Sequence, residues 1–283
     1  MNRTGMAYEL PKVAESLGRL DGAVAMVTGS GRGLGRMIAE TLMAMGANMV
    51  LHDISEEAPA QYGEAESLTA VSEQLSVGGA RAIAVTGDIS QEQQVDAMVR
   101  RAQDQLGPIS ILVNCAGGDI GAQGQKPNPN GALDVSLADA AAVFQRNFMG
   151  TFLMCRAVCP GMEAMKKGTV INIGSLNGHQ GVSPEVIYGC AKAAILHYTR
   201  CLALEMRPHG VRVNAVSPGP TKSARFLATR TLDEGMMHDR VSLDRYAEPM
   251  EIARAVAFLA SDSSAFISGQ VLRVDGGATL FPG

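Results

Sequence analysis

Residues 23–35 read Ala-Val-Ala-Met-Val-Thr-Gly-Ser-Gly-Arg-Gly-Leu-Gly. The apolar run 23–27 predicts a buried strand, and apolar residues at helical spacing over 37–45 predict a helix directly after the glycines. Glycines between a strand and a helix let a pyrophosphate approach the backbone, and the helix start offers free N–H groups. Although Leu34 and Arg36 depart from the G-x-G-x-x-G spacing, we interpret the stretch as a dinucleotide site rather than an ordinary tight turn.

Asp53 bears on the choice of dinucleotide. It follows a second predicted strand, 48–52, and lies eighteen residues after Gly35. A carboxylate at this distance accepts a hydrogen bond from the ribose 2′-hydroxyl and repels a 2′-phosphate, which favours NAD over NADP. Arg32 and Arg36 favour NADP mildly, because either could meet a 2′-phosphate. We give more weight to Asp53, since its position is the one that touches the 2′ carbon.

Ser175, Tyr188 and Lys192 form a candidate catalytic group. Tyr188 and Lys192 are four residues apart and share one face of the helix predicted over 186–208. A phenol titrates near pH ~10, and a neighbouring cation is one of the few devices that lower this pKa by the ~3 units needed for exchange near neutrality. Ser175 follows a predicted strand, 169–173, and could hold a substrate oxygen beside the phenol. Taken alone, the trio also fits a partly exposed helix face.

Together these motifs resemble those of the short-chain dehydrogenase/reductase family, of the single-domain type with a Rossmann fold. Thr28–Gly35 fits the TGxxxGxG motif of that family. Asn114–Gly117 fits its NNAG segment, with Cys115 in place of the second asparagine. The resemblance runs from about Leu20 to Ala278, which is nearly the whole chain.

The resemblance implies a set of site residues. The catalytic tetrad would be Asn147, Ser175, Tyr188 and Lys192. The cofactor-binding residues would be Gly29, Gly31, Arg32, Gly33, Leu34, Gly35, Asp53, Asp88, Ile89, Asn114, Ala116, Gly117, Tyr188, Lys192, Pro218, Gly219 and Thr221. Asn147 would anchor a water that links Lys192 to solvent, although its residue type also suits a structural bond within a helix. For Asn114 we favour a role in stabilising the sheet centre, and Ser223 competes with Thr221 for the nicotinamide carboxamide.

Composition fits one domain over 20–283, preceded by a frayed extension, 1–19. A hydrophobic content of 46% fills a sizeable core, while a net charge of −4 gives no reason to expect nucleic acid or an anionic membrane as a partner. No apolar stretch is long and unbroken enough to cross a bilayer, and no long apolar run stands at the N-terminus. The five cysteines are odd in number and lack metal-ligand spacing, so we expect a cytoplasmic protein with reduced thiols and no metal.

Strands and helices alternate along the chain, which predicts an α/β fold with a doubly wound parallel sheet in three αβα layers. Beyond the segments already named, the pattern predicts helices near 64–78, from a capping box at 90–93 to about 106, from after Ser136 to Gly161 and over 250–259, and strands over 82–85, 109–113, 211–216 and 271–274. The segment 117–134 is longer than is usual in the family.

These features predict an NAD-dependent dehydrogenase for a secondary alcohol, with Tyr188 as acid/base. Substrate contacts are expected from a polar set with few aromatic residues, which favours a small sugar, polyol or hydroxy acid: Asp119, Gln123, Asn128, Asn130, Asn177, His179, Gln180, Glu185, Arg225, Arg230, His238 and Arg240. Two alternatives stay open, an NADPH-dependent 3-oxoacyl-carrier-protein reductase and a non-catalytic nucleotide-binding protein. The resemblance also implies a homotetramer, with the long Ala-rich helix and helix 186–208 as candidate interfaces.

Overall fold

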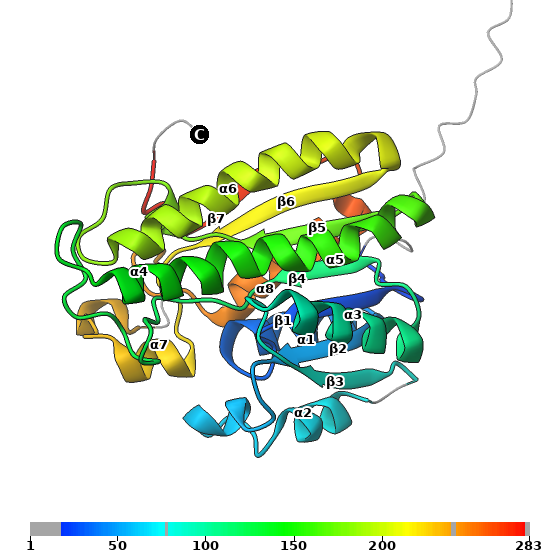
Figure 1. The fold of residues 1–283 in the computed structure, drawn as a ribbon, viewed down its shortest axis with the longest axis horizontal. Coiled ribbons are helices and arrows are strands. Elements are labelled where there is room, and N and C mark those ends of the chain that lie inside the picture. Colours follow the sequence, from blue (N-terminus) through cyan, green and yellow to red (C-terminus); the bar gives the residue numbers. More distant parts are fainter. Residues whose placement is uncertain (1–17, 77–78, 239–241, 281–283) are drawn as a thin grey trace, which may run out of the picture.

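Seven strands pair into one parallel sheet in the computed structural model, which describes residues 18–76, 79–238 and 242–280 (Figure 1). The strands are β1 (Val24–Thr28), β2 (Asn48–Asp53), β3 (Ala82–Thr86), β4 (Ile111–Asn114), β5 (Gly168–Ile173), β6 (Val211–Pro218) and β7 (Val271–Val274). Their order is β3-β2-β1-β4-β5-β6-β7, so the direction of winding reverses between β1 and β4. This confirms the doubly wound α/β prediction, and ligands of such sheets bind outside the carboxyl ends of the strands at that reversal.

Helices cover both faces of the sheet. They are α1 (Gly33–Ala44), α2 (Leu68–Leu75), α3 (Glu92–Leu106), α4 (Leu137–Phe144), α5 (Gly150–Met165), α6 (Val186–Met206), α7 (Ala224–Thr229) and α8 (Pro249–Ala260). Short helical turns are η1 (Ala58–Tyr62), the π-helix η2 (Gln145–Met149), η3 (Leu176–Gly178), η4 (Arg207–His209), η5 (Glu234–Met236) and η6 (Asp262–Ser264).

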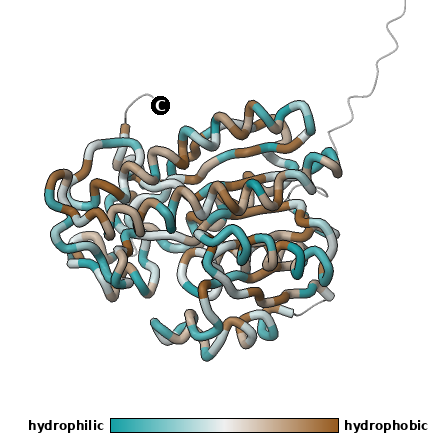
Figure 2. Tube along the Cα trace, in the orientation of Figure 1, coloured by the Kyte–Doolittle hydropathy of each residue, from teal (hydrophilic) through white to brown (hydrophobic). Residues whose placement is uncertain are grey.

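Alternation of side chains along the strands builds two hydrophobic cores. In β1, Ala25 and Val27 pack with α1 and α8, whereas Val24 and Met26 pack with α3 and α5. Both faces of the sheet are therefore buried, and Figure 2 shows hydrophobic segments, in brown, running through the centre of the molecule. Because the strands are held from both sides, their carboxyl ends form a firm edge on which a site can be built.

Two local predictions are wrong. The expected capping box at 90–93 does not form: the Ser90 N–H is held by Asp88 Oδ1, and α3 begins at Glu92. The helix expected to end by Gly161 continues to Met165 with Pro160 inside it. Since Met162 is fully buried there, its packing outweighs the backbone hydrogen bond that a proline forfeits.

Other boundaries differ from the predictions by a few residues. The helix expected near 64–78 is shorter as α2, and η1 precedes it. At the start of the domain, Leu20 is buried and its N–H donates to Met45 O at 2.8 Å. The predicted extension 1–19 falls, up to residue 17, outside the described residues. None of the described helices has the length and apolar character needed to span a membrane.

Candidate active site

Tyr188 and Lys192 lie together at the start of α6. Lys192 Nζ stands 5.7 Å from the centroid of the Tyr188 ring and donates to Ile173 O at 2.7 Å. The lysine is buried, which lowers its pKa to about 8. Because the bond to Ile173 ties the ammonium to the end of β5, the cation is held beside the phenol rather than in solvent.

Tyr188 has a pKa raised above the usual phenol value, and burial is the largest cause. A hydrogen bond from Ser175 and the charge of Arg225 lower it, but less than burial raises it. The expectation that Lys192 sets a lowered phenol pKa is therefore wrong for this structure, because desolvation of the phenolate dominates. Sequence reasoning missed Arg225 in this role and counted it only among possible substrate contacts.

Ser175 is the first residue after Gly174 at the end of β5 and begins η3. Its Oγ accepts a hydrogen bond from Asn177 N at 3.2 Å. The turn packs tightly on α6, since a Cβ atom on Gly178 would lie 3.0 Å from the Lys192 backbone. This contact fixes Ser175 against the helix that carries the tyrosine and the lysine.

Asn147 lies in the π-helix η2 and is fully buried. Its side chain exchanges two hydrogen bonds with Gly118, both of 2.9 Å, and donates a third to Val143 O at 2.8 Å. The two bonds with Gly118 fix the Gly117–Gly118 loop after β4, and the third ties the side chain to its own helix. These bonds use the side-chain amide of Asn147. Binding of a water by Asn147 therefore stays a prediction, and it concerns the backbone carbonyl oxygen.

The glycine turn after β1 is as tight as its composition indicates. A Cβ atom on Gly35 would overlap the Gly29 carbonyl oxygen and lie 2.7 Å from the carbonyl carbon. One on Gly31 would lie 2.9 Å from Asp53 Oδ2. Leu34, in the first turn of α1, packs against the core. The turn thus brings bare backbone to the face where Asp53 ends β2.

Two supports of this turn were missed by sequence reasoning. Thr28 Oγ1 accepts hydrogen bonds from Cys115 N and Ala116 N, both at 3.0 Å, and so joins β1 to β4. His52 Nδ1 accepts from Gly29 N at 3.3 Å, and its Nε2 lies 2.9 Å from Gly87 O. Burial lowers the pKa of His52, so the ring is neutral and its Nε2–H donates to Gly87. The signal in the sequence that could have indicated these roles is a polar residue, Thr28 or His52, at the end of an otherwise apolar strand.

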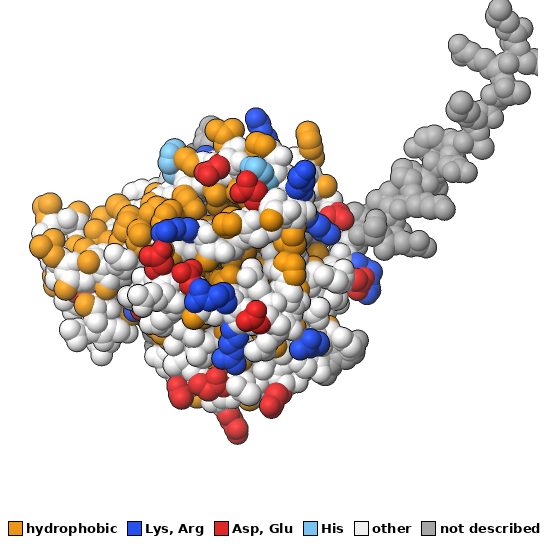
Figure 3. All heavy atoms as spheres, turned by 45° about the vertical axis from the view of Figure 1, so that its right-hand side comes forward, with side chains coloured by type: hydrophobic (Ala, Val, Ile, Leu, Met, Phe, Trp, Pro, Cys, Tyr) orange, Lys and Arg blue, Asp and Glu red, His pale blue; other side chains and the backbone are white. Residues whose placement is uncertain are grey.

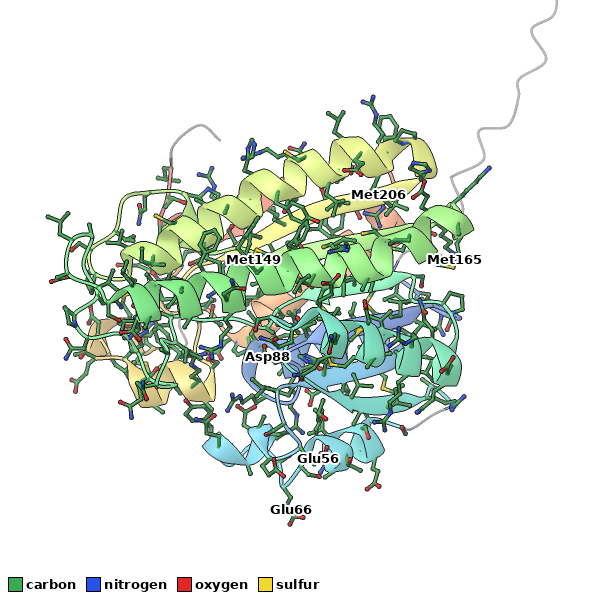
Figure 4. All side chains as sticks on the ribbon, in the orientation of Figure 1. Glu56, Glu66, Asp88, Met149, Met165 and Met206 are labelled. Atoms are coloured by element: carbon green, nitrogen blue, oxygen red, sulfur yellow. The ribbon has the colours of Figure 1, made fainter. Side chains whose placement is uncertain are left out.

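The segment 54–67 folds over the glycine turn. Arg32 donates to Ala58 O at 3.0 Å and stands 5.2 Å from the centroid of the Tyr62 ring. Glu64 Oε2 accepts from Gly33 N at 2.7 Å, and its carbonyl accepts from Arg36 at 2.8 Å. Figure 4 places Glu56 and Glu66 of this segment beyond β3, at the lower edge of the molecule. We call the segment 54–67 the strap; it engages both arginines near the turn.

Asp53 provides the test of fit for a dinucleotide. The residue is buried, its Oδ1 accepts from Ile54 N at 2.9 Å, and its Oδ2 has no hydrogen-bond partner among the described residues. A buried carboxylate oxygen without a donor is costly. A ribose hydroxyl is a donor of the kind this oxygen requires, so Asp53 and the bare turn fit the predicted cofactor.

The remaining cofactor candidates divide into two groups. Asn114 donates to Asn172 Oδ1 at 2.9 Å inside the sheet, which is the structural role favoured for it, and Ile89 is buried under Gly150. Asp88, labelled in Figure 4, bonds Ser90 as described above. In the Pro218–Thr221 loop, Gly219 N donates to Val274 O at 3.0 Å and Thr221 donates to Gly219 O at 2.9 Å.

Ser223, the alternative to Thr221 in the sequence analysis, lies close to the glycine turn. Its Cβ atom would be 3.5 Å from a Cβ placed on Gly33. Its Oγ caps α7 by accepting from Phe226 N at 3.2 Å. The loop after β6 thus approaches the turn after β1, and the two segments meet there.

Glu185 gathers the substrate-side candidates. It is buried at the start of α6 and pairs with Lys126 at 2.7 Å, with Arg230, and with Asn177 Nδ2 at 2.9 Å. Asn130 and Asp119 join the same region. Of the other candidates, His179 has its Nε2 atom 2.9 Å from Ser217 Oγ. The exposed candidates are Gln123, Asn128 and Gln180, and Arg240 lies outside the described residues.

Comparison with known proteins identifies the family to which the chain belongs. A family model described as enoyl-(acyl carrier protein) reductase matches residues 29–279. The chain belongs to the short-chain dehydrogenase/reductase family. Oxidoreductase UcpA of Escherichia coli is 34% identical over 273 residues, which cover 93% of this chain and 97% of that protein. A 3-oxoacyl-[acyl-carrier-protein] reductase of Synechocystis sp. is 34% identical over 266 residues, with 93% and 99% covered.

A solved structure of this short-chain dehydrogenase/reductase family superposes closely. It is a 7α-hydroxysteroid dehydrogenase complexed with NADH and 7-oxo glycochenodeoxycholic acid, with a TM-score of 0.80 and 32% identity, covering 92% of this chain and 95% of that one. The present short-chain dehydrogenase/reductase is thus an oxidoreductase that acts on a CH–OH group with a nicotinamide cofactor.

Proposed function

We propose that the protein is an NAD-dependent dehydrogenase that interconverts a secondary alcohol and a ketone, with Tyr188 as acid/base. The single observation that carries this proposal is the juxtaposition of Tyr188 with Ser175 and with the buried ammonium of Lys192. A partly buried phenol that is hydrogen-bonded to a hydroxyl and faces a cation is suited to proton exchange. The polar walls of the site favour a small hydroxylated substrate, such as a sugar, polyol or hydroxy acid.

The protein side of the reaction follows from these contacts. When bound, the nicotinamide supplies hydride transfer, which is chemistry of the cofactor itself. Ser175 holds the substrate oxygen next to Tyr188, which removes the hydroxyl proton in oxidation and returns it in reduction. Lys192 carries its charge below pH ~8, in keeping with a pKa of about 8, and holds it 5.7 Å from the centroid of the Tyr188 ring.

The site residues that we propose for the cofactor are those of the family resemblance, with Asp53 as the determinant of NAD. Asp53 Oδ2 suits a ribose 2′-hydroxyl and opposes a 2′-phosphate. Arg32 is engaged by the strap, and Arg36 pairs with Glu40 at 2.8 Å. With both arginines occupied, the observation that favoured NADP loses weight.

A 3-oxoacyl-carrier-protein reductase is the second candidate, favoured by the relative from Synechocystis sp.. Two observations favour the leading proposal over it. Asp53 disfavours NADPH, and a net charge of −4 does not suggest a basic docking patch for a carrier protein.

A substrate panel tests the proposal. Polyols, sugars, hydroxy acids and 3-oxoacyl thioesters are offered with NAD(H) and NADP(H), and turnover is read from nicotinamide absorbance. We expect NAD-linked oxidation of a polar alcohol, lost by more than ~10³-fold in Tyr188→Phe with NADH binding unchanged. Tyr198→Phe, a tyrosine ten residues further along α6, is the matched control and keeps activity. Full activity of Tyr188→Phe would refute the assignment.

We further propose a homotetramer that uses α4, α5 and α6. Figure 3 shows hydrophobic side chains gathered on the face where these helices lie. Leu137 of α4 and Leu204 of α6 are 90% and 65% exposed, and large apolar side chains exposed on one face are typical of subunit contacts. Light scattering is expected to give four times the chain mass, and a monomeric mass would contradict the proposal. Cytoplasmic location stays a prediction from the cysteines.

A further inference from the structure

Three carboxylate oxygens are buried without a hydrogen-bond partner among the described residues. They belong to Asp53, Glu64 and Asp119. Asp53 is accounted for by a ribose hydroxyl, and Glu64 belongs to the strap and binds the same glycine turn through its other oxygen, Oε2. Asp119 lies on neither the turn nor the strap, so the cofactor does not explain it.

Asp119 is fixed firmly by its neighbours. Only 6% of the residue is exposed, and Asn130 Nδ2 donates to its Oδ2 at 2.7 Å. The preceding residue, Gly118, is held by Asn147 through both its N–H and its carbonyl. Because backbone and side chain are both restrained, Oδ1 cannot turn to find a donor elsewhere. An unpaired carboxylate oxygen of this kind costs stability unless a ligand supplies the missing donor.

Asp119 also lies within electrostatic reach of the reacting phenol. Its charge raises the pKa of Tyr188. Asn130, which holds Asp119, accepts through its carbonyl from Glu185 N at 3.1 Å, three residues before Tyr188. On the other side, a Cβ atom on Gly118 would meet the Arg225 guanidinium at 2.5 Å. Asp119 is therefore the part of the 118–134 wall that is tied, through Asn130, to the start of the helix that carries the catalytic tyrosine.

The chemistry of the missing group follows from the acceptor. An ionised carboxylate accepts hydrogen bonds and donates none, so its ligand must present a donor. Thioesters and ketones present only acceptors at this position, and a substrate carboxylate would meet like charge. A hydroxyl group next to the reacting carbinol supplies a donor without adding charge.

Resting on the proposed function, we infer that Asp119 is a specificity-determining residue whose Oδ1 accepts a hydrogen bond from a second hydroxyl of the substrate. The substrate class is then a neutral diol or polyol, in which one hydroxyl reacts at Tyr188 and a neighbouring one binds Asp119. A site built around such a bond rejects an analogue that lacks the hydroxyl, because the buried acceptor is left unpaired.

Matched substrate pairs test this inference. Butane-2,3-diol is compared with butan-2-ol, and pentane-2,4-diol with pentan-2-ol, in the wild type and in Asp119→Asn. The wild type is expected to favour a diol by ~100-fold or more in kcat/KM. In Asp119→Asn, Asn130 keeps the amide oxygen and the amide N–H₂ faces the substrate, so the diol loses ~10-fold or more while the mono-alcohol does not.

Controls separate specificity from structure and from the proposed function. Asp134→Asn changes an exposed carboxylate of the same segment, bonded to Gly131 N at 2.8 Å, and keeps the diol preference. NADH binding, followed by its fluorescence, stays unchanged in both variants. Equal turnover of diols and mono-alcohols by the wild type, or equal losses on both in Asp119→Asn, overturns the inference and leaves the proposed function standing. Absence of turnover on all four alcohols also overturns the inference, and the proposed function falls only if the whole substrate panel is inactive with both cofactors.

Discussion

The nucleotide side and the substrate side of the site hold their functional groups by different means. On the nucleotide side, from β1 to α2, bare glycine backbone and buried strand ends form the site, and Asp53 is placed by the register of β2. On the substrate side, residues 117–134 are joined to α6 and α7 by side chains, above all through Glu185 with Lys126 and Arg230.

This difference indicates which property a substitution on each side should change. Backbone contacts in a close-packed turn tolerate no added atom, so changes there act on cofactor binding with every substrate. Ion pairs between loops tolerate a change in the shape of a side chain but depend on its charge. Changes on the substrate side should therefore alter substrate preference while cofactor binding persists.

Gly35→Ala is the largest test of the nucleotide side. Its Cβ atom collides with the Gly29 carbonyl, so the turn must shift, and we expect a loss of ~3 kcal/mol or more in stability together with loss of NADH binding. Thermal unfolding and NADH fluorescence measure the two effects. Gly181→Ala is the matched control, because a Cβ there meets nothing within 4 Å. Normal NADH affinity in Gly35→Ala would show that cofactor binding does not depend on the close backbone contact at Gly35.

Glu185→Gln tests the substrate side. The side chain is 9% exposed and faces two cations, so its neutralisation is expected to cost ~2 kcal/mol of stability and to raise KM for the substrate, with the NADH Kd unchanged. Glu163→Gln, which removes a half-exposed carboxylate 3.2 Å from His209, is expected to change neither. Weakened NADH binding in Glu185→Gln would break the separation between the halves.

Arg225→Gln probes the place where the halves meet. Arg225 donates to Gly117 O at 3.3 Å and lowers the pKa of Tyr188 by its charge. Removal of that charge raises the pKa of the phenol, so the rising limb of kcat/KM for alcohol oxidation should move to higher pH. The control is Arg254→Gln, an exposed arginine of α8. A limb that stays in place, or moves to lower pH, would show that Arg225 does not act on the tyrosine.

Glu251→Gln is expected to have the smallest effect, because Glu251 lies in α8, away from both walls. Arg245 and the Glu248 backbone hold the pKa of Glu251 at about 2, below the ordinary value of 4.5. A carboxyl with a lowered folded-state pKa stabilises the fold above pH ~4.5, and this contribution fades as pH falls toward ~2. We expect ~0.5 kcal/mol at pH 6, since the group is partly exposed.

Unfolding curves of Glu251→Gln and the wild type should therefore converge as the pH falls. Glu66→Gln, which changes an exposed carboxylate of the strap, serves as the reference. A difference between Glu251→Gln and the wild type that grows toward acid pH would contradict the assigned sign.

Prediction from sequence succeeded where the signal was local. Apolar runs and the glycine spacing located all seven strands and the turn, because burial patterns repeat within an element. The spacing of Tyr188 and Lys192 placed both on one helix face. The capping box at 90–93 failed because Asp88 offered the Ser90 N–H a competing acceptor. The π-helix that carries Asn147 gave no periodic signal, since it shifts the register within a continuous helix.

The sequence by itself determined the order of elements, the glycine turn, and the presence of a serine, a tyrosine and a lysine at the ends of a strand and on a helix. Tertiary structure alone decided that Glu185 meets Lys126 and Arg230, 59 and 45 residues away along the chain, and that Asp119 keeps an unpaired oxygen. It also decided that the Tyr188 pKa is raised. The reason is physical: periodicity is a property of neighbouring residues, whereas burial and charge depend on everything that the fold brings near.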